Sequence, residues 1–133
     1  MSHGYSGKPL FKKLGMKPWS IWRVVNAPAD YSVLLGPVEA VTFTNSEKDL
    51  DGIHWFAKST EDVEKALVDG REMIKRNGMI WVSWYKKSAR IPTDVTEDVI
   101  RDTALHIGLV DVKVCAVDDK WSALKIVWRK ENR

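Results

Sequence analysis

The amino-acid sequence predicts an α/β protein whose open, mostly parallel sheet has about six strands, with helices on both faces and a C-terminal antiparallel hairpin. Three observations support this prediction. Short uncharged runs rich in Val, Ile and Trp recur along the chain, as in strands that are covered on both faces. Two segments with helical spacing of apolar residues separate the later runs. The last part of the chain alternates between apolar and polar residues, which is typical of a hairpin.

The central strand is predicted at residues 79–84, the uncharged run MIWVSW. Residues 85–88, which read YKKS, end it abruptly. A strand that ends in Lys86, Lys87 and Ser88 could present cations and a hydroxyl to a cleft at the edge of the sheet. The alternative is a core strand followed by a solvated loop, and the sequence leaves both interpretations open.

A short helix and three shorter strands precede this run. Pro9 suits the first turn of a helix at residues 10–14, which Gly15 can end, within a short helical extension at residues 1–19. This helix has few apolar positions, so we expect it on the surface. A second short helix is expected from Asp30 to about Leu35. The strands are predicted at residues 21–26, 40–44 and 53–57.

The first of the two longer helices follows the third strand. Ser59 or Thr60 can cap its N-terminus. Asn77 and Gly78 would supply a left-handed stop at its C-terminus.

The second long helix and the hairpin complete the chain. Asp94 and Glu97 fit the capping-box pattern at the start of this helix, and Gly108 can end it. The hairpin strands are predicted at residues 110–116 and 124–128, with a turn at residues 118–120.

The size and composition of the chain narrow the classes of protein. Its 133 residues suit a single domain, residues 1–133, that can bury a substantial core. No apolar run approaches the ~20 residues needed to span a bilayer, and no signal-peptide core follows the N-terminus. The single Cys115 excludes an intramolecular disulfide. A cytoplasmic location is therefore expected.

The net charge of +3 is unevenly distributed. Residues 1–29 carry five bases and no acid, residues 30–70 carry nine acids and three bases, and residues 71–93 carry six bases and one acid. The two basic segments could meet in space and attract an anion or a nucleic acid. The more ordinary outcome is that they pair with the acidic segment between them.

Histidines and tryptophans are the other residues that could carry chemistry. The three histidines lack metal-ligand spacing, and His54 is expected to be a buried histidine with its hydrogen bonds satisfied. Three of the seven tryptophans fall in predicted central strands. The others could cover the end of the sheet, or an exposed one beside a lysine could stack on a nucleobase; these are Trp19, Trp22, Trp121 and Trp128.

The order of the elements resembles the class I methyltransferase architecture, a Rossmann-like sheet whose last strand runs antiparallel. The resemblance implies a ligand site beyond the carboxyl ends of the strands. Such methyltransferases need a glycine-rich turn after the first strand and an acid at the end of the second. Here residues 26–30 read NAPAD, and Thr44 with Asn45 stand where the acid belongs. The sequence therefore indicates a degenerate form of the fold and assigns no cofactor.

A closer resemblance rests on residues 4–18, 78–88 and 93–133. Together they resemble a family of small bacterial proteins described only as a domain of unknown function. The resemblance implies a compact bacterial, cytoplasmic protein and brings no catalytic residue with it. The positions that match its motifs are Trp81, Ser83, Trp84, Lys86, Lys87, Asp94, Thr96, Glu97, Asp111, Lys113, Asp118, Trp121, Ser122 and Lys125.

The candidate ligand-binding residues lie at predicted strand ends and along the hairpin. They are Asn26, Lys58, Ser59, Lys86, Lys87, Ser88, Asp118, Trp121, Ser122 and Lys125. The structural alternative is a network of ion pairs and helix caps.

The sequence favours a non-catalytic binding or interaction protein whose partner is another protein or a small anionic ligand, with no role for a membrane. No catalytic or metal-binding residue is assigned. Two alternatives stay open. One is a small atypical S-adenosylmethionine-dependent methyltransferase. The other is a nucleic-acid or anion binder that uses residues 8–17 and 86–90.

Overall fold

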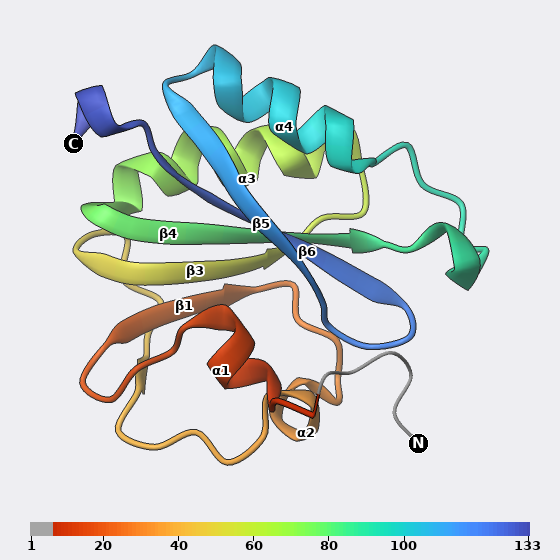
Figure 1. The fold of residues 1–133 in the computed structure, drawn as a ribbon, viewed down its shortest axis with the longest axis horizontal. Coiled ribbons are helices and arrows are strands. Elements are labelled where there is room, and N and C mark those ends of the chain that lie inside the picture. Colours follow the sequence, from red (N-terminus) through yellow and green to blue (C-terminus); the bar gives the residue numbers. More distant parts are fainter. Residues whose placement is uncertain (1–6) are drawn as a thin grey trace.

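The computed structural model describes residues 7–133, which form a six-stranded sheet with helices on both faces (Figure 1). The predicted fold class is confirmed. The strands are β1 (Ile21–Val25), β2 (Thr42–Phe43), β3 (Leu50–Phe56), β4 (Ile74–Tyr85), β5 (Leu109–Ala116) and β6 (Trp121–Trp128). The helices are α1 (Leu10–Leu14), α2 (Tyr31–Leu35), α3 (Thr60–Met73) and α4 (Glu97–His106), with short 3₁₀ turns η1 (Lys87–Ala89) and η2 (Lys130–Asn132).

The strands follow the order β2-β1-β3-β4-β6-β5 across the sheet. The pairs among β1, β2, β3 and β4 are parallel, whereas β6 runs antiparallel to both β4 and β5. The chain passes from β1 outward to β2 and then returns to β3 on the other side of β1. The strand order therefore reverses between β1 and β3, which is where an open α/β sheet forms a ligand crevice.

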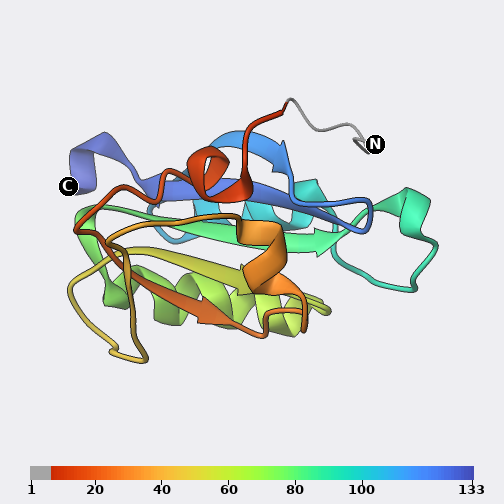
Figure 2. The ribbon, with the colours of Figure 1, turned by 90° about the horizontal axis from the view of Figure 1, so that it is seen from below.

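The sheet separates two apolar cores. Figure 2 shows α1 and α3 on opposite sides of it. The first core lies under α3 and α4, where Leu67 and Ile100 pack with buried residues such as Ile80 of β4. The second lies under α1 and α2 and includes Trp22 and Trp81, both fully buried. Because both faces are covered, the central strands can be almost wholly apolar.

Helix α1 belongs to the second core, although the sequence predicted a surface position for it. Leu10 and Leu14 are both buried in that core. The Trp81 indole N–H also donates a hydrogen bond of 2.9 Å to the Leu14 carbonyl oxygen. Two apolar residues four apart are thus enough to attach this five-residue helix to the sheet.

Helix α3 ends earlier than the sequence predicted. Its last residue is Met73, and Asn77 and Gly78 lie within β4 rather than at a left-handed stop. Gly78 has a different role, since a Cβ there would lie 3.0 Å from the backbone oxygens of Leu50 and Asp51. The glycine therefore permits a close approach of β3 and β4. At the other end of α3, the N-cap is Ser59, one of the two residues that the sequence predicted for it.

Helix α4 begins two residues later than the capping-box pattern indicated. Its N-cap is Thr96, whose hydroxyl accepts a hydrogen bond from the Val99 N–H. Asp94 instead accepts hydrogen bonds from the Thr60 N–H and hydroxyl, both at 3.1 Å. Thr96 thus satisfies the Val99 N–H, which has no partner within the first turn of α4. Asp94 is therefore available to connect α4 with α3.

The remaining predicted strands and the hairpin are present with shifted bounds. The second strand is the most reduced, because Ala40 has a positive φ of 57° and only Thr42–Phe43 pairs with β1. The tryptophans Trp22, Trp55, Trp81, Trp84, Trp121 and Trp128 are buried, and Trp19 is exposed. Among the described residues, no helix has the length and apolar character required to cross a membrane.

Candidate ligand-binding cleft

A cleft of about 210 Å³ lies at the reversal of strand order, beyond the carboxyl ends of β1, β3 and β4. We call it the carboxyl-end cleft. The turn between β5 and β6 closes its far side. Its lining residues are Asn26, Ala27, Pro28, Asp30, Lys58, Tyr85, Ile91, Asp118, Lys120 and Trp121. Four of the predicted site residues, Asn26, Lys58, Asp118 and Trp121, therefore come together.

The loop after β1 forms the first wall of the cleft. Asn26 is exposed and takes a left-handed backbone conformation with φ of 59°, which Asn tolerates better than most residues. This bend turns the chain out of β1 and toward Pro28, whose carbonyl oxygen accepts a hydrogen bond from the Tyr31 N–H at 3.0 Å. The amide side chain of Asn26 is thus placed at the mouth of the cleft.

The segment after β3 supplies the second wall. The backbone of Lys58 is fixed on both sides, because its N–H donates to Asp62 and its carbonyl oxygen accepts from Thr93. Its ammonium group is exposed. Ser59 does not line the cleft, and its hydroxyl accepts from the Asp62 N–H at 3.1 Å as the cap of α3. A backbone held by two hydrogen bonds therefore carries an exposed lysine at this wall.

The hairpin turn forms the third wall. The Asp118 carboxylate accepts hydrogen bonds of 2.8 Å from the N–H groups of both Lys120 and Trp121, so it stabilises the turn. The Trp121 ring stacks on Tyr85, with centroids 4.0 Å apart. The Lys86 N–H donates to the Lys120 carbonyl oxygen at 2.8 Å. These contacts fix an aromatic surface beside the exposed Lys120.

The basic residues that follow β4 lead into η1. Lys86 precedes this 3₁₀ turn, and Lys87 and Ser88 are exposed within it. From the same segment, Tyr85 and Ile91 are the residues that line the cleft. The assignment of Lys86, Lys87 and Ser88 to a ligand thus stays a prediction.

Two hairpin residues that the sequence grouped with the site lie elsewhere on β6. Ser122 pairs with Trp84 and alternates with Trp121, so its side chain lies on the opposite face of the sheet. Lys125 pairs with Trp81 and Lys113 in the middle of the strand. Ser122 and Lys125 therefore lie on opposite faces of the sheet, and neither of them lines the cleft.

A buried chain of three polar side chains connects α2 with β3 and β4. The Tyr31 hydroxyl lies 2.8 Å from His54 Nδ1, and His54 Nε2 lies 2.7 Å from Ser83 Oγ. His54 and Ser83 are fully buried. Burial lowers the pKa of His54 to about 3 and raises the pKa of Tyr31. The imidazole is therefore neutral at pH 7, with one nitrogen donating and the other accepting. The prediction of a satisfied core histidine is confirmed.

A second pocket, of about 410 Å³, lies between β1, β2 and α2. It shares Ala27 with the carboxyl-end cleft, so the two hollows flank the loop after β1. Tyr31 lines this pocket and connects it to the buried His54. Its other lining residues are Val24, Ser32, Leu35, Phe43, Thr44 and Asn45.

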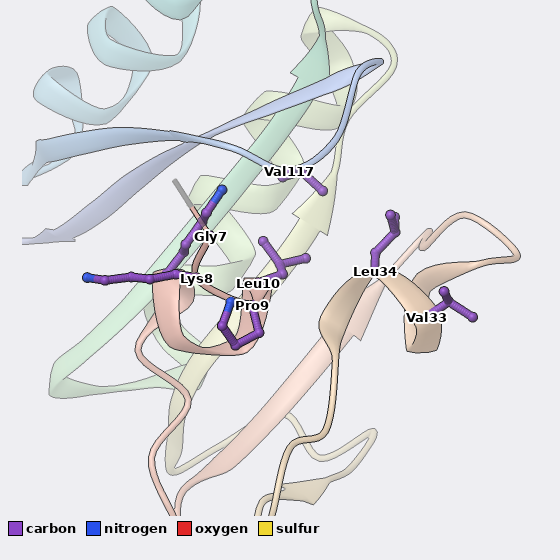
Figure 3. A pocket seen from close by; sticks show the side chains of 8 residues that line it. Gly7, Lys8, Pro9, Leu10, Val33, Leu34 and Val117 are labelled. Atoms are coloured by element: carbon purple, nitrogen blue, oxygen red, sulfur yellow. The ribbon is translucent and has the colours of Figure 1, made fainter. Parts of the chain in front are cut away.

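A third hollow, of about 330 Å³, lies between α1, α2 and the end of β5 (Figure 3). Apolar side chains from Leu10, Leu34 and Val117 surround it. Lys8 and Lys13 also line it. This hollow has few convergent polar groups, so the carboxyl-end cleft is the better ligand site.

Sequence reasoning missed several lining residues, including Asp30, Tyr85, Ile91 and Lys120. Ile91 and Lys120 lie in loops whose path no periodicity predicts. The stacking of Tyr85 on Trp121 depends on the antiparallel register of β4 and β6. Within residues 7–133, no group of His, Cys, Asp or Glu has the arrangement of a metal site.

The sheet order and the position of the cleft define a Rossmann-like fold of the class I methyltransferase type. A SAM-dependent methyltransferase from Aquifex aeolicus aligns with a TM-score of 0.63 at 13% identity, over 93% of this chain and 90% of that chain. A TehB-like SAM-dependent methyltransferase from Corynebacterium glutamicum aligns with a TM-score of 0.59 at 10% identity, over 95% of this chain and 90% of that chain. At such identities the likeness concerns the fold.

Residues 40–130 match the family model "Protein of unknown function (DUF3052)", and the chain belongs to this family. Both resemblances inferred from the sequence are thereby confirmed. No curated protein matches the chain.

The loop after β1 does not fit S-adenosylmethionine in the way the fold usually binds it. Residues 26–30 contain no glycine, and Pro28 has no N–H to donate. Thr44 and Asn45, at the end of β2, offer no carboxylate for the ribose hydroxyls.

Proposed function

We propose that this protein is a non-catalytic binding protein whose carboxyl-end cleft takes a small ligand with a carboxylate or phosphate group. The observation that carries the proposal is the cleft itself. It places Asn26, Lys58 and Lys120, from three separate segments, around one crevice, which Asp30 and the hydrogen-bonded Asp118 also line. Amides and lysines together recognise oxyanions.

The volume of the cleft supports a small ligand. The volume of about 210 Å³ is below the roughly 300–1,000 Å³ of pockets for drug-sized molecules. The lining contains no Ser, Thr, Cys or His, and its titratable side chains are Asp30, Lys58, Tyr85, Asp118 and Lys120. The Asp118 carboxylate is already engaged by two backbone N–H groups.

Thermal unfolding with inorganic phosphate, citrate or AMP as the probe tests the proposal. At about 100 times its dissociation constant, a ligand of the folded state adds roughly 2.7 kcal/mol to the free energy of unfolding. We expect at least one probe to raise the melting temperature of the wild type. Replacing both Lys58→Gln and Lys120→Gln should abolish that rise and leave the melting temperature without ligand unchanged.

Two further variants make this test specific. The pair Lys48→Gln and Lys65→Gln removes the same charge from exposed lysines outside the cleft, so it should preserve the response. The pair Lys86→Gln and Lys87→Gln tests the site predicted from the sequence. If only that pair abolishes the response, the ligand binds at η1 rather than in the carboxyl-end cleft.

The alternative function is that of a small atypical S-adenosylmethionine-dependent methyltransferase. The likeness to solved methyltransferases over most of the chain favours it, and the pocket beside Thr44 provides room next to β1. The loop without glycine argues against it. Isothermal titration with S-adenosylmethionine decides between the two functions. We expect no saturable heat, whereas micromolar binding would establish the alternative.

A further inference from the structure

Trp19 is displayed to solvent on a strained backbone. Its side chain makes the residue 87% exposed, and its φ of 72° lies in the left-handed region that bulky residues rarely adopt. Its N–H donates a 2.6 Å hydrogen bond to the carbonyl oxygen of Ala40, whose φ is also positive. Packing gives no reason for this arrangement, because the indole is not buried. Strain that is kept at such a place is typical of binding sites.

Lysines gather beside the segment that carries Trp19. Lys113 of β5 and Lys125 of β6 lie directly opposite each other in the antiparallel ladder, where like charges destabilise the pair. Burial, followed by repulsion from Lys113 and Lys17, lowers the pKa of Lys125. Lys17 and Lys113 are therefore both close enough to Lys125 to repel its charge.

No acid compensates these three cations. Within residues 7–133, no carboxylate forms an ion pair with Lys17, Lys113 or Lys125. Asp111, on the same strand as Lys113, instead accepts a hydrogen bond from Arg101 of α4, which covers the other face of the sheet. A cluster of like charges kept without a partner favours an anionic ligand.

We propose that Trp19, Lys17, Lys113 and Lys125, here called the Trp19 surface, bind single-stranded nucleic acid. The lysines contact phosphate groups, and the exposed indole stacks on an unpaired base. Single-strand binders combine these two elements, a basic surface that follows the backbone and aromatic rings that stack on bases. A duplex keeps its bases stacked inside, so it cannot use Trp19.

The Trp19 surface differs from the basic surface predicted from the sequence. That prediction joined residues 8–17 with residues 86–90. In the structure η1 follows the carboxyl end of β4, whereas the segment between α1 and β1 lies at the other end of the sheet (Figures 1 and 2). The lysines that lie near Lys17 are instead those of the hairpin, since Lys17 and Lys113 both act on Lys125. None of these three lysines lines the carboxyl-end cleft.

Fluorescence anisotropy of a labelled oligothymidine of about 12 nucleotides tests this proposal. We expect saturable binding at about 50 mM salt that weakens strongly by about 200 mM. Trp19→Gly should weaken binding about tenfold, which corresponds to one lost stacking contact. Trp19→Phe keeps an aromatic ring and should retain most of the affinity.

The charge of the surface is tested by its effect on salt dependence. Lys113→Gln with Lys125→Gln should reduce the salt slope of log K by about 1.4, since each phosphate contact on a single strand contributes roughly 0.7. The matched pair Lys48→Gln and Lys65→Gln should leave the slope unchanged. Thermal melting confirms that each variant is folded.

Three results would overturn the proposal. They are no binding at low salt, equal affinity for wild type and the folded Trp19→Gly variant, or equal affinity for a duplex of the same length. The cleft variant with Lys58→Gln and Lys120→Gln should bind the oligonucleotide normally. The two proposed functions can therefore fail independently of each other.

Discussion

Gly52 and Trp22 show how one side chain determines what its neighbour can be. The two residues are partners in the β1–β3 ladder, and Trp22 is fully buried. A Cβ added to Gly52 would lie 2.5 Å from two carbons of the Trp22 indole. Real Cβ atoms do not approach other atoms so closely, and a buried indole in a dense core cannot move away freely. Glycine at position 52 is therefore required by Trp22.

Gly52→Ala is expected to lower the free energy of unfolding by about 1–3 kcal/mol, the usual cost of overpacking a core. Urea denaturation measures this loss. Trp22→Phe removes the outer indole atoms that the new Cβ would meet. In that background Gly52→Ala should cost clearly less than in the wild type. Simple additivity of the two changes would show that their contact is not the cause.

Helices α3 and α4 are connected through their first turns. Thr96 caps α4, and the Asp94 carboxylate accepts both hydrogen bonds that Thr60 offers at the start of α3. Thr96→Ala should cost about 1 kcal/mol, as the loss of a Thr N-cap usually does. Asp94→Ala should destabilise α3 and α4 together, because it removes their connection.

Double-mutant cycles, measured by urea denaturation, distinguish the two roles. Asp94→Ala and Thr60→Ala should show a coupling energy of at least about 0.5 kcal/mol, since the residues contact each other. Thr96→Ala and Thr60→Ala should be additive. Coupling in the second cycle and none in the first would mean that Thr96, not Asp94, connects α4 with α3.

The sequence predicted the elements well because local chemistry determines them. The helix at residues 10–14 followed from Pro9 and Gly15 at its ends, and the hairpin followed from the alternation of apolar and polar residues. The errors arose where a contact distant in sequence decides. Asn77 and Gly78 have the sequence of a helix stop. Gly78 is instead needed because the backbone oxygens of Leu50 and Asp51 leave no room for a Cβ.

The site was partly predictable for the same reason. The ends of parallel strands meet at one edge, so the grouping of Asn26 with Lys58 followed from the strand order. Lys125 lies beside Lys113 and Trp81 in the middle of β6, a position that follows from the register of the strands and not from the pattern of residues.

At the scale of the whole molecule, His54 joins three elements through one neutral ring. Tyr31 comes from α2, His54 from β3 and Ser83 from β4. The ring also stacks on Phe56, with centroids 4.3 Å apart. Opening any of these elements hydrates the imidazole and allows it to take up a proton. Protonation of His54 is therefore coupled to unfolding of the whole sheet.

The free energy of unfolding should consequently decrease as the pH falls below 6.5. The pKa of His54 is about 3 in the folded protein against 6.5 for a free side chain, so the unfolded state binds the proton first. The stabilisation is complete above pH 6.5 and is lost progressively down to about pH 3. Its slope is about 1.4 kcal/mol per pH unit. From pH 6.5 to 5 the loss attributable to His54 should be about 2 kcal/mol.

Urea unfolding of wild type and His54→Gln between pH 7 and pH 5 measures this contribution. The variant lacks the titrating ring, so its stability should change less with pH, and the carboxylates common to both proteins cancel in the difference. Tyr31→Phe is the matched control, because it loses a hydrogen bond, worth about 1 kcal/mol, but keeps a buried imidazole. It should retain the wild-type pH dependence. Parallel curves for wild type and His54→Gln would show that His54 does not remain neutral in the folded protein.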